Sequence, residues 1–166
     1  QAGELPLDQY PLLAQQLLAA LRVIDAESAA QAWLAADPAN PHAHLNAGLL
    51  ALLRSHEAGL ALVEQAAALD AGLVPLARSL SAAVARAQLE SDPAYQQLLL
   101  GREAANLGYP LIGELLCAQA VQINPAYAEA WALLGELQQR NGRGGLDALE
   151  QALALDPEST LVRSLL

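Results

Sequence analysis

The chain has 166 residues, of which 54% are hydrophobic and 4% aromatic, and its net charge of −10 argues against nucleic-acid binding, which demands a basic patch. All eight basic residues are arginines, and the lack of lysine excludes Schiff-base, P-loop and kinase-type lysine chemistry. No charge-free apolar run approaches the roughly 20 residues of a membrane span, so direct membrane insertion is not expected.

The apolar residues are mostly alanine and leucine, which are strong helix formers and predict an all-α chain with closely packed helices. The chain begins with Gln1 and contains no methionine, so we expect a processed chain or a piece of a longer one. Its single cysteine, Cys117, excludes an internal disulfide and leaves the redox compartment open. A cytoplasmic location is expected rather than export.

Proline, glycine and capping residues divide most of the chain into segments that read as a helix, a turn and a second helix. These segments are 7–40, 41–72, 94–127 and 128–157. In the first, Asp8 is predicted to cap a helix that runs to about Arg22, and Val23 to Asp25 are predicted to form the turn. Asn40 and Pro41 have the residue types of an N-cap and a first helical position, so they predict the start of the next helix.

Small residues recur at a fixed spacing in these segments. Gly48 follows Ala14 by 34 residues (48 − 14), and Gly135 follows Gly101 by 34 (135 − 101). The second pair of segments also carries a turn glycine, a small residue, a closing proline and a Trp-x-x-Leu-Gly sequence: Gly108, Ala120, Pro125 and 131–135. These residues resemble the tetratricopeptide repeat (TPR), a helix–turn–helix unit of about 34 residues. The resemblance is specific over 94–157 and looser over 7–72, where His44 stands at the tryptophan position.

The period fails between the second and third segments. The surplus residues near 74–92 predict one irregular helix, covering about 74–90, with leucines and a valine at near-helical spacing. It is either a repeat reduced to one helix or an inserted helix that reshapes the groove. At the other end, 158–166 predicts a short helix that covers the apolar face of the last repeat.

The resemblance implies an all-α, α-solenoid domain over 1–166, with about nine or ten helices and no strand. It also implies a non-enzymatic scaffold or adaptor that holds a protein or peptide partner in a concave groove. Two alternatives stay open: a regulatory or substrate-recognition appendage of a larger enzyme, and a module that self-associates.

In TPR proteins the first helix of each hairpin lines the inner surface, so the stripe facing away from the second helix is the candidate peptide-binding site. Helical spacing places the candidates on two first helices: Tyr95, Leu98, Arg102 and Asn106 on one, and Glu129, Ala132, Glu136, Gln139 and Arg140 on the other. Their aromatic, amide and charged groups suit an extended peptide held through its backbone and a basic or polar side chain.

No pattern predicts a catalytic, metal or cofactor site. His42 and His44 point apart on a helix and have no third ligand near them in sequence, so a surface helix start is favoured over a metal site. Cys117 lies among apolar residues and predicts a buried structural thiol. The glycine-rich segment 141–145 lacks the Lys-Ser/Thr of a phosphate-binding loop and predicts a turn. Acidic residues are scattered singly, as on solvated helix faces.

Overall fold

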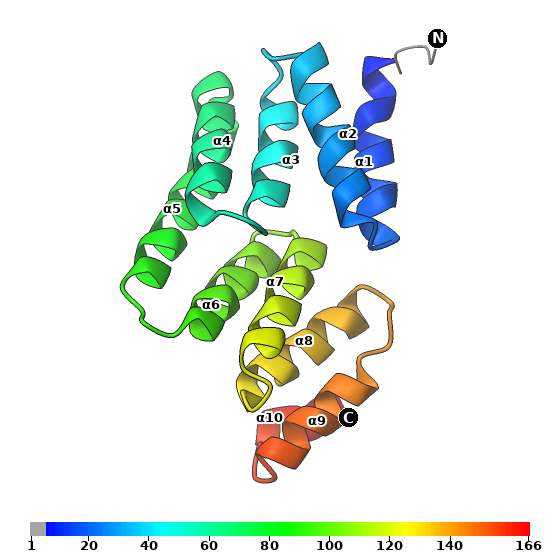
Figure 1. Ribbon diagram of the computed structural model, residues 1–166, viewed down its shortest axis with the longest axis vertical. Helices are drawn as coiled ribbons and strands as arrows, with labels where there is room; N and C mark the ends of the chain where they lie inside the picture. Colours follow the sequence, from blue (N-terminus) through cyan, green and yellow to red (C-terminus); the bar gives the residue numbers. More distant parts are fainter. Residues whose placement is uncertain (1–5) are drawn as a thin grey trace. The chain divides into compact units, whose positions relative to one another are not determined.

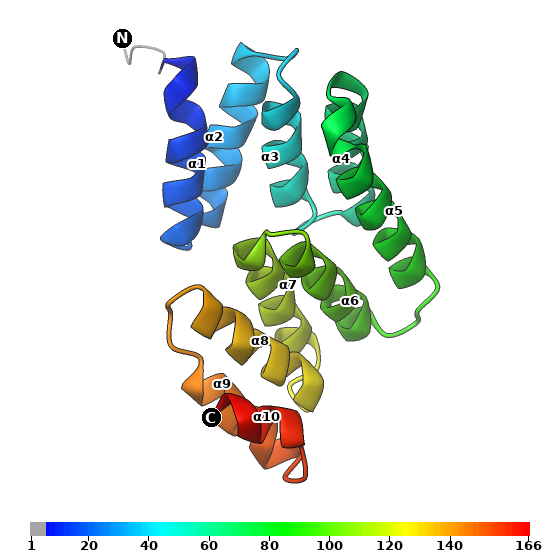
Figure 2. The ribbon, with the colours of Figure 1, turned by 180° about the vertical axis from the view of Figure 1, so that it is seen from behind.

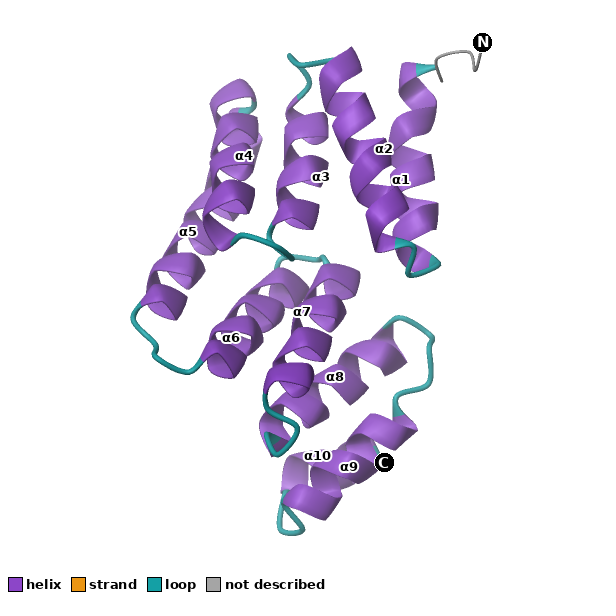
Figure 3. Ribbon diagram, in the orientation of Figure 1, coloured by secondary structure: helices purple, strands orange, loops and turns teal. Residues whose placement is uncertain are grey.

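The computed structural model describes residues 6–166, and within that range the chain is helical, without a strand (Figure 1, Figure 3). Ten α-helices and two short 3₁₀ helices follow one another. In chain order they are η1 (Leu7–Gln9), α1 (Tyr10–Ala19), α2 (Val23–Ala36), α3 (Pro41–Ala51), α4 (His56–Leu69), η2 (Ala71–Leu73), α5 (Val74–Gln88), α6 (Pro93–Asn106), α7 (Pro110–Ile123), α8 (Ala128–Arg140), α9 (Leu146–Leu155) and α10 (Thr160–Leu165). The predicted all-α fold with nine or ten helices is confirmed.

The chain forms two compact units, with the boundary between Ser81 and Ala82 inside α5. The first unit contains the hairpins α1–α2 and α3–α4, and the second contains α6–α7 and α8–α9. The two helices of a hairpin lie side by side in both views of the molecule (Figure 1, Figure 2). The helix predicted near 74–90 is α5, which ends at Gln88. That residues 1–166 form a single domain stays a prediction.

Helix starts follow the capping residues of the sequence. The side chain of Asn40 accepts hydrogen bonds from the amides of His42 (3.0 Å) and Ala43 (3.4 Å), and Pro41 begins α3 as predicted. The predicted turn at Val23 to Asp25 is wrong, because α2 already begins at Val23. Asp25 instead lies in the first turn of α2, where a carboxylate is favourable.

The predicted capping role of Asp8 is also wrong. Asp8 lies inside η1, and α1 begins at Tyr10 and ends at Ala19. The early end follows from the left-handed residue Leu21, which has φ 57. An L-residue in that conformation cannot continue a right-handed helix, so the turn comes before Val23 rather than after it.

In three of the four hairpins the paired helices touch through a glycine of the first helix. A Cβ atom added to Gly101 of α6 would lie 2.8 Å from Sγ of Cys117 and 3.0 Å from the carbonyl oxygen of Gly113, both in α7. The same close approach occurs at Gly48 and Gly135 in their hairpins. A larger residue at these positions would force the two helices apart.

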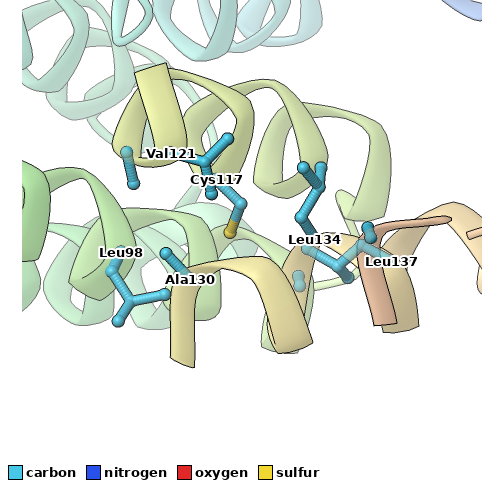
Figure 4. Close-up of a cluster of buried hydrophobic side chains, with 9 residues drawn as sticks. Leu98, Cys117, Val121, Ala130, Leu134 and Leu137 are labelled. Carbon is cyan, nitrogen blue, oxygen red and sulfur yellow. The ribbon is translucent and has the colours of Figure 1, made fainter. Parts of the chain in front are cut away.

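The core of the second unit is built from small and aliphatic side chains of four helices, α6, α7, α8 and α9. Leu98 of α6, Cys117 and Val121 of α7, and Leu134 and Leu137 of α8 pack together in one buried cluster (Figure 4). A neighbouring cluster includes Val162 of α10, which is 2% exposed. The C-terminal helix therefore packs against the last hairpin, as predicted.

The two units repeat the same contacts at a spacing of 87 residues (131 − 44). In the first unit Nε2 of His44 lies 2.8 Å from the carbonyl oxygen of Pro38, and in the second Nε1 of Trp131 donates to the carbonyl of Pro125 at 2.8 Å. His44 thus occupies the tryptophan position in space as well as in sequence. One ring nitrogen ties the first helix of a hairpin to the preceding loop in both units.

The turn inside the first hairpin of each unit repeats as well. Leu21, with φ 57, and Gly108, with φ 93, are 87 residues apart (108 − 21), and both adopt a left-handed conformation. The amide of the following residue, Arg22 or Tyr109, donates to a carbonyl five positions back, at 2.8 and 2.9 Å. Each unit is therefore built on the same backbone plan.

Candidate functional site

The predicted site residues lie on α6 and α8, the first helices of the two hairpins in the second unit. Asp92 fixes the start of α6, since its side chain accepts a hydrogen bond from the amide of Ala94 at 2.9 Å. At the start of α8, the bond from Trp131 to Pro125 fixes the loop. Both helix starts are thus held in place by side-chain contacts.

Two predicted residues from different helices come together. The guanidinium of Arg102 on α6 forms an ion pair with the carboxylate of Glu129 on α8. Both side chains are about half exposed, at 46% and 52%. An exposed ion pair contributes only about 0–1 kcal/mol to stability, so the fold does not depend on it. The pair places donors and acceptors at the solvent face between two hairpins.

Two tyrosines lie against the same part of the second unit. Tyr95, which was predicted, and Tyr127, which was not, are both partly buried and pack against the buried cluster formed by α6, α7, α8 and α9. Burial raises the pKa of Tyr127 to about 12, and the charges of Glu129, Tyr95 and Asp92 add to this, whereas Arg102 opposes it. Tyr127 therefore lies close to the ion pair and stays protonated at neutral pH.

The placement of Leu98 on the exposed stripe is wrong, and so is that of Ala132. Leu98 is fully buried in the cluster with Ala130 of α8 (Figure 4). Ala132 is 5% exposed and packs in a neighbouring cluster with Leu149 of α9. The prediction treated the side of α6 away from α7 as open. In the structure α8 covers part of that side, so the exposed stripe is narrower than helical spacing alone implies.

The other predicted residues differ in their surroundings. Asn106 and Arg140 are exposed and Glu136 is partly buried. The amide nitrogen of Gln139 donates to the carbonyl oxygen of Leu165 at 3.1 Å, so this side chain is engaged with the C-terminal helix. The contacts bring Arg102 and Glu129 together, whereas Gln139 is turned toward α10.

A buried carboxylate was missed by the sequence reading. Glu114 on α7 is 3% exposed, accepts a hydrogen bond from Asn141 at 2.6 Å and forms an ion pair with Arg143. In the first unit Glu27, 87 residues earlier (114 − 27), pairs with Arg54 at 2.6 Å. The glycine-rich segment 141–145 is the predicted turn, but it also holds the carboxylate of the preceding hairpin.

The described residues contain no group of three or more side chains suited to holding a metal ion. Cys117 is buried, as predicted, and burial raises the pKa of its thiol to about 12, an effect that Arg102 slightly opposes. Between residues 6 and 166, no helix is both long and apolar enough to cross a membrane.

No family model matches the sequence, and no curated protein matches it. Among solved structures the chain is similar to YrrB, described as a TPR protein with an unusual peptide-binding site, with 18% identity and a TM-score of 0.45 over 94% of this chain and 89% of YrrB. It is also similar to MamA from Desulfovibrio magneticus RS-1, with 16% identity and a TM-score of 0.41 over 93% and 97%. Another crystal structure of MamA has 17% identity and a TM-score of 0.39 over 91% and 73%.

The helical hairpins themselves are TPR-like. Small residues of the first helices repeat at 34 residues in each unit, and in three of the four hairpins that residue is a glycine in contact with the second helix. A proline loop closes the first hairpin of each unit. The structure thus defines the class of protein: an all-helical array of TPR-like hairpins.

Proposed function

We propose that the chain is a non-enzymatic interaction module that binds an extended segment of another protein across α6 and α8. The observation that carries this proposal is the exposed ion pair between Arg102 and Glu129, which joins the first helices of two hairpins at the solvent face. The partly buried rings of Tyr95 and Tyr127 pack against one buried cluster of the same unit. Aromatic residues and arginine are the types enriched in protein interfaces.

The chemistry suits recognition of a peptide backbone. A guanidinium has five N–H donors, and one nitrogen of Arg102 meets Glu129 while the side chain remains 46% exposed. Asn106 lies four residues further along α6, is exposed, and offers both a donor and an acceptor. The backbone carbonyl groups of an extended segment that crosses α6 would accept hydrogen bonds from these two side chains, and its apolar groups would contact the tyrosine rings.

In the test, displayed random short peptides are selected for binding to the intact chain. The affinity of each selected peptide is then measured for the parent chain and for a variant that carries both Arg102→Ala and Asn106→Ala. We expect at least tenfold weaker binding, about 1.4 kcal/mol, with little change in melting temperature. Arg22→Ala is the matched control, because Arg22 forms another exposed ion pair, with Asp25 at 2.7 Å, in the first unit. Unchanged affinity in the folded double variant would refute the proposed site.

The other functions expected from the sequence stay predictions. A regulatory or substrate-recognition role within a larger enzyme is tested by reading the coding sequence on both sides of this chain. Self-association is tested by light scattering, and a strictly monomeric mass at high concentration would rule it out.

A further inference from the structure

A groove in the first unit lies between α2 and α3, at the junction of its two hairpins. Its volume is about 380 Å³, and its lining includes Ile24, Ser28 and Gln31 of α2 and Ala47, Leu50 and Ala51 of α3. Ala47 and Leu50 are buried and form an apolar floor, whereas the side chain of Ile24 is 70% exposed at the rim. The groove belongs to the first unit alone, so it is separate from the surface over α6 and α8.

The repeat of 87 residues shows what occupies this place in the second unit. Ser28 corresponds to Leu115 (115 − 28), Ala47 to Leu134 and Ala51 to Gln138. Leu134 is 6% exposed and packs into the buried cluster with Val121 of α7. At these three positions the second unit therefore carries larger side chains than the first unit does, whereas Gln31 corresponds to the smaller Ala118.

The charges at the groove neutralise each other. Glu27 and Arg54, which both contribute to the lining, form an ion pair at 2.6 Å. The groove is therefore neutral although the chain as a whole carries a charge of −10. A neutral, mostly apolar hollow with a few polar groups at its edge is complementary to an uncharged apolar group rather than to a charged one.

We propose that the groove between α2 and α3 is a second binding surface, which takes a leucine-sized aliphatic side chain from a segment of a partner protein. That side chain would lie where Leu134 and Leu115 lie in the second unit. The amide of Gln31 at the rim would contact the backbone of the same segment. The proposal does not rest on the surface over α6 and α8, because the two sites share no residue.

The experiment selects displayed random short peptides on the intact chain and compares binding to two variants. The first variant, Ser28→Leu with Ala51→Gln, places the residues of the second unit at two solvent-accessible positions of the groove. The second, Ile24→Gln, removes the exposed apolar rim without adding bulk. Ala61→Leu with Ala68→Gln on α4 is the matched control, because both alanines are exposed in the same unit outside the groove lining.

The expected result is a set of peptides that share one leucine, isoleucine or methionine. Their binding should weaken at least tenfold on the Ser28→Leu/Ala51→Gln variant and on Ile24→Gln, and when that aliphatic residue is replaced by alanine. The control variant should bind as the parent chain does. The proposal would be overturned if the peptides bound all variants equally or if their binding did not depend on an aliphatic residue. It would also be overturned if the selection enriched no peptide. Peptides sensitive only to Arg102→Ala and Asn106→Ala would overturn it while leaving the proposed function intact.

Discussion

The contact between Gly101 and Cys117 allows the close approach of α6 and α7 to be tested quantitatively. A methyl group at Gly101 would lie 2.8 Å from Sγ of Cys117, 3.0 Å from the carbonyl oxygen of Gly113 and 3.4 Å from the amide nitrogen of Cys117. The first distance cannot be kept, so the sulfur or the helix must move. We expect Gly101→Ala to lower the free energy of unfolding by about 1–3 kcal/mol through overpacking, although the higher helix propensity of alanine offsets up to about 1 kcal/mol.

The cause can be isolated with a double-mutant cycle. Cys117→Ala removes the sulfur and leaves a small void, which costs about 1 kcal/mol. The double variant should then cost less than the two single changes together, with a coupling of about 1 kcal/mol. Unfolding in urea, followed by circular dichroism, measures all four proteins. Gly72→Ala is the control, because the nearest atom to its added methyl group is a side-chain oxygen of Asp70 at 3.1 Å. Additive effects of Gly101→Ala and Cys117→Ala would refute the steric argument.

Three further predictions concern buried and partly buried groups. Glu114→Gln should destabilise the chain by about 2–4 kcal/mol, because it removes the buried carboxylate that pairs with Arg143. Glu27→Gln should cost only about 0–1 kcal/mol, since its partner Arg54 is 66% exposed, and urea unfolding measures both variants. Burial on folding raises the pKa of Cys117 from 9.0 to about 12, so the free energy of unfolding should fall as the pH rises above 9.0. The fall should be smaller in Cys117→Ala, and iodoacetamide should label the thiol only when the chain unfolds. Trp131→Ala should cost about 3 kcal/mol in the same assay, and a loss below about 1 kcal/mol would contradict the anchoring role of its ring.

The sequence was sufficient for the hairpins because their determinants are local. Asn40 and Pro41 define a helix start through contacts within a few residues, and Gly101 and Gly135 mark the tightest helix contact by their size alone. The turn near Leu21 escaped prediction for the same reason. A leucine gives no local signal of a left-handed conformation, whereas glycine at the matching position 108 does.

The candidate site was harder to predict because it depends on how hairpins stack. Leu98 is buried by α8, a helix about thirty residues further along the chain, and helical periodicity within α6 cannot show that. Tyr127 precedes α8 and so fell outside the stripe that was counted. Glu114 looked like one of many scattered acids, because its partners Asn141 and Arg143 lie in the loop after the following helix.

The repeat at 87 residues explains why sequence identity is a weak guide within this chain. His44 and Trp131 differ in size and charge chemistry, yet each directs one ring nitrogen to a loop carbonyl at 2.8 Å. Once a ring nitrogen makes this hydrogen bond, the rest of the side chain at that position can differ between the two units. The same freedom lets the second unit carry leucines where the first has Ser28 and Ala47. A common backbone plan therefore supports two different surfaces, and the open groove between α2 and α3 is one consequence.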